Sequence, residues 1–177
     1  MLIELRVSYE VSPVTLAILS EKIDGRHVSL ILESDETEDS HVGQSPLKIM
    51  DLACRFYGSS LKGRQDGTRD ICGITHKAPI SVDPSSGMYF FPTTSPQNPK
   101  CAWIAHSHVG SVIKAPNHCT KIIFKNGRSL TLEVSHGSIL NQVHRTAQYR
   151  YLLDKRIKYL LKNNVDIVAE PPFFHDK

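Results

Sequence analysis

The sequence predicts an α+β fold, in which a largely antiparallel sheet of hairpins is combined with two main helices. Three observations support this prediction. Short runs of Val, Ile and Leu are separated by turn residues, which is typical of strands in hairpins. An Asn-Gly pair lies between alternating apolar residues in 121–134, and this is a strong hairpin signal. Two segments, 46–57 and 138–162, place apolar residues at helical spacing.

The first 32 residues predict two or three strands in a meander. Residues 2–9 and 14–19 are rich in apolar side chains, and 27–32 form another apolar run after a turn. The next segment, 33–44, has no apolar periodicity and carries five carboxylates between residues 33 and 39. We therefore expect a mobile acidic loop there.

Residues 46–57 predict the first main helix. Ser45 can cap free backbone donors of the first turn, and Pro46 suits the first helical position. Gly58 is placed to end the helix. We expect the apolar stripe to join the core and Arg55, which lies off that stripe, to point outward.

The middle of the chain predicts further short strands joined by tight turns. Between 71 and 94, apolar residues alternate with turn residues, most densely in the segment DPSSG at 83–87. Residues 101–113 predict a strand pair broken near Gly110. Within 121–134, the sequence predicts a two-residue hairpin turn.

Residues 138–162 predict the second main helix. Arg150 interrupts its apolar stripe, so either the helix breaks near Tyr149 or the arginine reaches to the edge of the buried face. A Pro pair follows and would stop any helix. We therefore expect a single domain over residues 1–163, including the acidic loop 33–44, and a short flexible tail over 164–177.

Composition agrees with one globular domain. The chain has 177 residues, of which 40% are hydrophobic and 22% charged. The net charge of +3 does not by itself indicate nucleic-acid binding. However, residues 33–39 are acidic, whereas 54–77 and 121–162 are predominantly basic, which would leave a positive face. The alternative is an ordinary scatter of solvated charges.

Location follows from the N-terminus and the hydropathy pattern. Glu4, Arg6 and Glu10 fall where a signal peptide needs its apolar core. No apolar run approaches the roughly 18 residues needed to cross a bilayer. We expect a cytoplasmic protein without a membrane partner, and we expect its four cysteines to be reduced thiols.

Catalysis, cofactor binding and metal binding are not expected. The sequence has no nucleophile elbow, P-loop, dinucleotide fingerprint or paired-carboxylate motif. Five potential metal ligands fall within nineteen residues, but they form neither a Cys-x-x-Cys pair nor a helical His pair. These residues are Cys101, His106, His108, His118 and Cys119.

A basic cluster is the first candidate for nucleic-acid contact. Glycines at 58, 63 and 67 would let the backbone approach a phosphate closely, and nearby hydroxyls suit phosphate oxygens. The alternative is an ordinary solvated loop. Five cations could share one surface patch here, namely Arg55, Lys62, Arg64, Arg69 and Lys77.

The hairpin tip is the second candidate. A two-residue turn would place Lys125 and Arg128 opposite each other beside Asn126 and Gly127. The narrow minor groove of A/T-rich DNA attracts such cations. The alternative is a solvated turn. We expect folding to gather both candidates, with Lys125, Asn126 and Arg128 among the DNA-binding residues, into one cationic ridge.

Several segments resemble a known family. CRFYGSS, GRQDGT, THKAPISVDPSSGMYFFPT and CAWIAHSHV, in that order and spacing, resemble the ComK family of competence transcription factors. The likeness continues through FKNGRSLTLEVS and NQVHRTAQYR and covers roughly residues 8–150. Individual DNA contacts are not transferred by these motifs.

The resemblance implies a transcriptional activator of competence genes. Such proteins bind paired A/T-rich promoter boxes mainly through the minor groove, as dimers that come together on DNA, and help RNA polymerase engage the promoter. No glycine turn of a helix-turn-helix is evident, so a major-groove recognition helix is not expected. The alternative is a regulatory module that has lost DNA binding and pairs with a full-length relative.

The C-terminus departs from the family pattern. Family members commonly continue into a longer tail that is bound by an adaptor of an ATP-dependent protease. This chain ends with NNVDIVAEPPFFHDK, which is short and lacks a recognisable tail. The departure argues against a protease adaptor as a partner.

Overall fold

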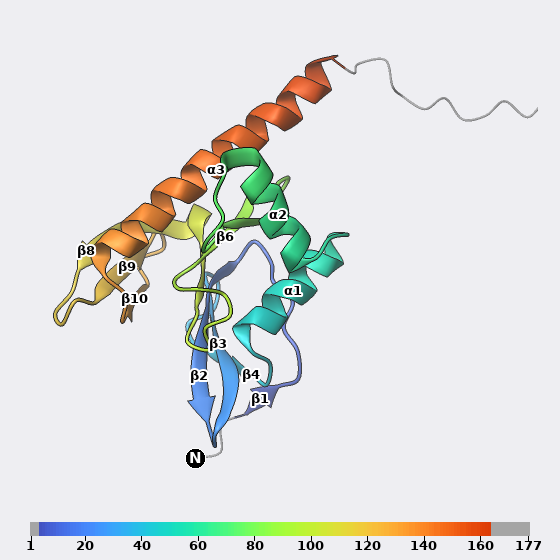
Figure 1. Ribbon diagram of the computed structural model, residues 1–177. Coiled ribbons are helices and arrows are strands. Elements are labelled where there is room, and N and C mark those ends of the chain that lie inside the picture. The colour runs from blue at the N-terminus through green and yellow to red at the C-terminus, as the bar shows by residue number, and fades with distance from the viewer. Residues whose placement is uncertain (1–3, 164–177) are drawn as a thin grey trace, which may run out of the picture.

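The computed structural model describes residues 4–163, in which groups of short strands are separated by a helix pair and followed by a long last helix (Figure 1). The elements are β1 (Leu5–Arg6), β2 (Thr15–Ile23), β3 (Arg26–Glu33), β4 (Ser40–Val42), α1 (Pro46–Phe56), α2 (Leu61–Cys72), β5 (Ile80–Asp83), β6 (Met88–Pro92), β7 (Trp103–Ala105), the 3₁₀-helix η1 (His106–His108), β8 (Val109–Lys114), β9 (Thr120–Phe124), β10 (Ser129–Leu132) and α3 (His136–Asn163). The α+β prediction is confirmed. The predicted main helices are α1 and α3, and α2 is an additional helix.

The strands form two sheets. The central sheet has seven strands in the order β1-β4-β3-β2-β7-β6-β5, and the second sheet has the order β10-β9-β8. Neighbouring strands are antiparallel, except that β1 pairs with β4 in parallel. Hairpins therefore account for most of the architecture, as predicted.

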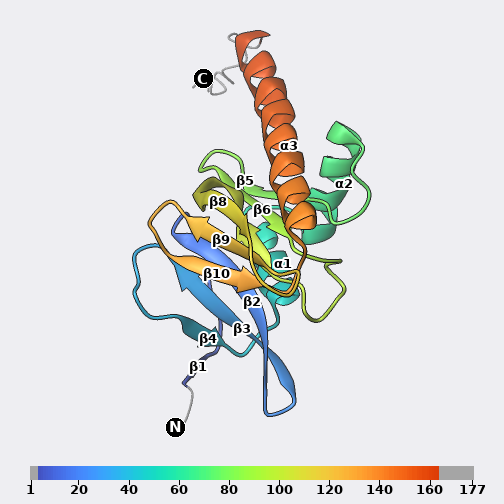
Figure 2. The ribbon, with the colours of Figure 1, turned by 90° about the vertical axis from the view of Figure 1, so that its left-hand side faces the viewer.

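The central sheet separates two hydrophobic cores. Because successive side chains of a strand point to opposite faces, Trp103 packs in the core beneath α1, whereas Ile104 packs in the core beneath the second sheet. Phe90 and Phe91 divide in the same way. Figures 1 and 2 show the result, with α1 on one side of the central sheet and β8, β9 and β10 on the other.

The first main helix agrees with its prediction to within one residue. α1 spans Pro46–Phe56, and the Ser45 hydroxyl accepts a hydrogen bond of 3.3 Å from the Lys48 backbone N–H. Ile49 and Met50 are fully buried, whereas Arg55 is exposed. The apolar stripe thus joins the core, and Arg55 points outward.

The last helix, α3, is continuous through Tyr149. Tyr149 is buried, and the guanidinium carbon of Arg150 lies 5.1 Å from the centre of the Tyr89 ring. Of the two alternatives, an arginine at the edge of the buried face is therefore the one observed. The last turns of α3 project beyond the rest of the fold (Figure 1).

Helix α2 was not predicted. The Ser60 hydroxyl caps its N-terminus by accepting a hydrogen bond of 3.0 Å from the Gly63 N–H. Gly73 ends the helix in the left-handed conformation, with φ +70°. Its buried side consists of Leu61 and Thr68, and the Thr68 hydroxyl donates a hydrogen bond of 2.6 Å to the carbonyl of Pro79. This mostly polar stripe carries no apolar periodicity from which a helix could be predicted.

Two strand predictions need correction. The break in 101–113 occurs at η1 and not near Gly110, and the flanking strands β7 and β8 belong to different sheets. The hairpin loop contains three residues instead of two. This is seen from the hydrogen bond of 2.8 Å that the Phe124 N–H donates to the Arg128 carbonyl. Arg128 therefore faces Phe124 and not Lys125.

The acidic loop is shorter and better held than expected. Glu33 ends β3 and residues 40–42 form β4, so the connecting segment covers residues 34–39 only. Side chains of the β9–β10 loop bond to this segment, as described below. The predicted tail, 164–177, lies outside the described residues. Within residues 4–163, no helix is both long and apolar enough to span a membrane.

Candidate nucleic-acid interface

The basic cluster is carried mainly by two consecutive helices. α1 ends at Phe56, and α2 begins at Leu61 after a short turn in which Gly58 has φ +77°. The carboxylate of Asp51 on α1 accepts a hydrogen bond of 3.0 Å from the Leu61 N–H. It also forms an ion pair of 2.9 Å with the Arg55 guanidinium. One acidic side chain thus fixes the start of α2 and neutralises the first predicted DNA-binding residue.

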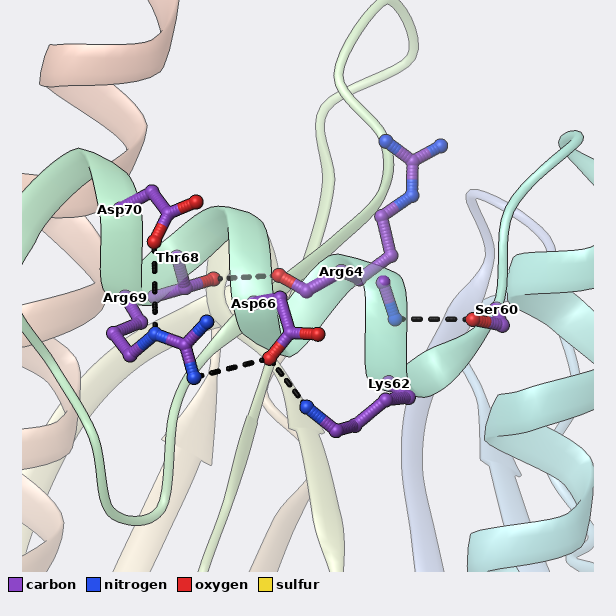
Figure 3. Close-up of polar contacts among 8 residues, drawn as sticks. Ser60, Lys62, Arg64, Asp66, Thr68, Arg69 and Asp70 are labelled. Carbon is purple, nitrogen blue, oxygen red and sulfur yellow. Dashed lines mark hydrogen bonds and ion pairs between the residues drawn. The ribbon is translucent and has the colours of Figure 1, made fainter.

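Two further predicted cations converge on an acid of their own helix. Figure 3 shows Lys62 and Arg69 reaching Asp66, with Nζ–Oδ1 and Nη1–Oδ1 distances of 2.5 and 3.3 Å. Arg69 also lies 3.5 Å from Asp70. The hydrogen bond from Lys62 holds the pKa of Asp66 below its usual range. The exposed face of α2 is therefore a mixed-charge surface.

The remaining two members of the cluster behave differently. Arg64 points away from the Lys62–Asp66–Arg69 group (Figure 3), is half-buried and donates 3.3 Å to the Val82 carbonyl. Lys77 lies in the loop after α2 with φ +48°, is exposed and makes no ion pair with any residue between 4 and 163.

The hairpin tip is held by the acidic segment. Arg128 donates hydrogen bonds of 2.7 and 3.2 Å to the backbone carbonyls of Glu33 and Glu36. Its guanidinium also pairs with the carboxylate of Asp39. Asn126 donates 3.3 Å to the Ser34 carbonyl. Lys125 is exposed.

The prediction of a single cationic ridge is wrong. The helix pair α1–α2 lies on one side of the central sheet, and the β9–β10 loop belongs to the sheet on the other side (Figures 1 and 2). Arg55, Lys62 and Arg69 are paired with acids of their own helices, and Arg128 is paired with Asp39. The eight predicted residues therefore form two groups, and most of their charge is balanced locally.

The concentration of positive charge on α3 was not included among the predicted site residues. Six cations lie between residues 145 and 162, with Asp154 as the only acid between them. The signal was present in the sequence as a basic stretch. Residues 121–162 are predominantly basic and predict a positive face, but no DNA-binding residue is predicted from the sequence in the helical part of this stretch. The six cations are Arg145, Arg150, Lys155, Arg156, Lys158 and Lys162.

The potential metal ligands do not form a cluster. In the part of the chain between residues 4 and 163, no three His, Cys, Asp or Glu side chains are close enough to hold a metal ion. All four cysteines are free thiols. Burial raises the pKa of the Cys54 thiol to about 11, so this cysteine is a protonated core residue at neutral pH.

Comparisons with known proteins agree with the resemblance seen in the sequence. Residues 6–158 match the family described as ComK protein. A relative from Bacillus subtilis (strain 168), the competence transcription factor, is 41% identical over 164 residues, which cover 93% of this chain and 84% of the relative. No solved structure matches this chain.

Proposed function

This chain belongs to the ComK family, and from that premise we propose that it activates competence genes by binding A/T-rich promoter DNA. In this proposal the protein contacts DNA mainly through the minor groove, acts as a dimer or higher assembly, and helps RNA polymerase engage the promoter in the bacterial cytoplasm. The observation that carries the proposal is the 41% identity to a competence transcription factor over nearly the whole chain.

Local pairing of the predicted cations is compatible with DNA binding. Lys62 and Arg69 are largely exposed, and ion pairs exposed to solvent contribute little to stability. A DNA phosphate can therefore displace Asp66 at little energetic cost. The proposed DNA-binding residues are Arg55, Lys62, Arg64, Arg69, Lys77, Lys125, Asn126 and Arg128.

The arrangement of α1 and α2 bears on the choice of groove. Two helices joined by a short glycine-containing turn also occur in proteins that place the second helix in the major groove. Here that helix would be α2, with Lys62 and Arg69 on its exposed face. The major groove is therefore the competing outcome of the binding test.

The test compares duplexes of defined composition by gel shift at two salt concentrations. We expect paired A/T boxes to bind more tightly than a G/C-rich duplex of equal length. Replacing A·T by inosine·cytosine pairs, which keep the minor-groove pattern of A·T but change that of the major groove, should preserve binding. Loss of binding on this replacement would instead favour the major groove.

The second candidate function is a regulatory module that binds no DNA and pairs with a full-length ComK relative. The internal neutralisation of Arg55, Lys62, Arg69 and Arg128 is the observation that favours it. It predicts that no duplex binds in the gel shift, while a full-length relative copurifies with this chain.

A further inference from the structure

A groove between α3 and the corner from β7 to β8 shares only Lys125 with the two predicted groups of the DNA site. It consists of two adjoining hollows that share His106 and Arg150. Figure 2 shows α3 beginning beside the second sheet, of which β8 is one edge strand. The first hollow is lined further by Tyr89 and Asp154, and the second by Ser107, Ser111, Lys125 and apolar side chains of β8 and α3.

The groove gathers cations that have no acidic partner. Among residues 4–163, no carboxylate lies within 4 Å of the charged groups of Arg150 or Lys125. Asp154 lines the first hollow, but its carboxylate pairs with Lys158 at 2.8 Å. This differs from the face of α2, where each exposed cation has an acid beside it.

His106 adds a buried nitrogen without a partner. Its Nδ1 atom is removed from solvent and makes no hydrogen bond within the described part of the chain. Burial lowers the pKa of His106, and the positive charges of Arg150 and Lys125 lower it further, against the Val143 backbone, which raises it. An anion in the groove would oppose both charges and favour the imidazolium form.

These features suit a phosphate group. A guanidinium and an ammonium attract the negative charge, and the exposed Ser111 hydroxyl is a potential donor to phosphate oxygens. The Ser107 hydroxyl is already used, because it donates a hydrogen bond of 3.3 Å to the Gly87 carbonyl. Lys125 stands on an exposed loop, and both hollows open on the surface, so a phosphate that belongs to a long duplex can reach them.

We propose that the groove formed by His106, Lys125 and Arg150 binds a backbone phosphate of duplex DNA. The inference rests on the proposed function and places a DNA contact between α3 and the corner from β7 to β8, on side chains that do not belong to α2. The groups that face His106 are Arg150, Asp154 and Tyr151 from α3, Lys125 from the β9–β10 loop and Tyr89 from β6. Of these, only Asp154 is acidic.

The test measures binding of an A/T-rich duplex by fluorescence anisotropy for wild type, Lys125→Ala and Arg150→Gln. We expect each variant to bind about five- to twentyfold more weakly and to lower the slope of log affinity against log salt by about 0.9. Lys22→Ala is the matched control, because this exposed cation lies on β2 outside the groove and should change affinity less than about twofold. Thermal melts verify that each variant is folded. If Arg150→Gln unfolds, the test uses Lys125→Ala alone, because this residue is exposed.

A pH series gives a second readout. Because the bound phosphate should raise the pKa of His106, the wild type should bind more tightly as pH falls from 8 to 6, by at most about tenfold per pH unit. His106→Asn should reduce this dependence. NMR of the His106 ring during titration with inorganic phosphate tests whether a free anion alone is the ligand.

Three outcomes would overturn the proposal. If the wild type binds the duplex but the groove variants bind equally well with an unchanged pH profile, the groove inference fails alone. If the wild type binds no duplex, the proposed function fails and the groove inference with it. If inorganic phosphate shifts the His106 signals while the variants leave DNA affinity unchanged, the groove is a small-anion site.

Discussion

The guanidinium of Arg128 is held by an acidic segment that lies far from it in the sequence. Two backbone carbonyls and the Asp39 carboxylate accept its hydrogen bonds. These are the groups that DNA phosphates would have to replace if Arg128 reads the minor groove. The acidic segment 34–39 is thus a competitor of DNA built into the chain.

We therefore predict that Asp39→Asn strengthens DNA binding. Removal of this carboxylate frees part of the guanidinium and removes a charge that repels phosphate, so affinity at low salt should rise about three- to tenfold. Fluorescence anisotropy with an A/T-rich duplex measures the change. Glu38→Gln is the control, because Glu38 is exposed in the same segment and makes no hydrogen bond with Arg128.

Equal gains from Asp39→Asn and Glu38→Gln would show that only the net charge of the segment matters. Unchanged affinity in Asp39→Asn would remove Arg128 from the proposed DNA-binding residues. Either result would limit the role of the loop at the hairpin tip.

At the scale of single residues, the sequence indicates which residues suit a turn, but it does not indicate which residues they contact. Asn126 and Gly127 indicated a hairpin loop, and Gly127 indeed adopts φ +89°. Neither residue indicates whether the loop has two or three residues, and that difference decides which residue faces Arg128. Its contact with Asp39 spans 89 positions of sequence and depends on the packing of two sheets.

Helix α2 shows how composition can hide an element. Gly63 and Gly67 lower its intrinsic helix propensity, and its buried side includes Thr68 in place of an apolar residue. Its caps, Ser60 and Gly73, were visible in the sequence, but they are weak signals without an apolar stripe between them. By contrast, α1 has both caps and stripe, and its prediction was confirmed.

The glycines of α2 lead to a stability prediction. A Cβ atom added at Gly67 meets nothing within 4 Å, so Gly67→Ala should raise the free energy of unfolding by about 0.5–1 kcal/mol through better helix propensity. Urea denaturation measures this difference. Gly73→Ala is the contrasting variant, because its φ of +70° is strained for alanine and the free energy should fall by about 1 kcal/mol.

The same variant reports on DNA contact. If the α2 backbone approaches a phosphate closely, Gly67→Ala should weaken duplex binding although it stabilises the fold. A stabilised variant with unchanged affinity would show that DNA does not approach α2 at this glycine. Destabilisation by Gly67→Ala would contradict the packing described for α2.

For the whole molecule, the projecting end of α3 bears on assembly. Tyr159, Leu160 and Leu161 are 68%, 56% and 69% exposed, although they are large apolar side chains. Adjacent exposed apolar groups of this kind commonly mark interaction surfaces. They support the part of our proposal in which a second copy of the chain forms a dimer.

We predict that Leu160→Glu combined with Leu161→Glu shifts the proposed dimer toward monomer. Charges in an apolar interface are costly, so the dimer dissociation constant should rise at least about tenfold, whereas exposed positions should leave the monomer fold intact. Sedimentation velocity measures the shift. The control combines Asn141→Glu with Gln148→Glu, two exposed positions nearer the start of α3.

A wild type that is monomeric at all concentrations would contradict dimerisation. A double variant that dimerises as well as the wild type would place the interface elsewhere. The fold class at this scale was predictable from hairpin and helix signals. The separation of the basic residues was not, because it follows from which strands enter which sheet.

The corner at η1 couples the two hydrophobic cores. Strand β7 belongs to the central sheet, and after three residues the chain enters β8 of the second sheet. Trp103, the only tryptophan in the sequence, is fully buried in one core, and its neighbour Ile104 in the other. Neither layer can melt without pulling this shared segment away from its partner, so unfolding should be one cooperative event, and the fluorescence of one indole ring reports on both halves.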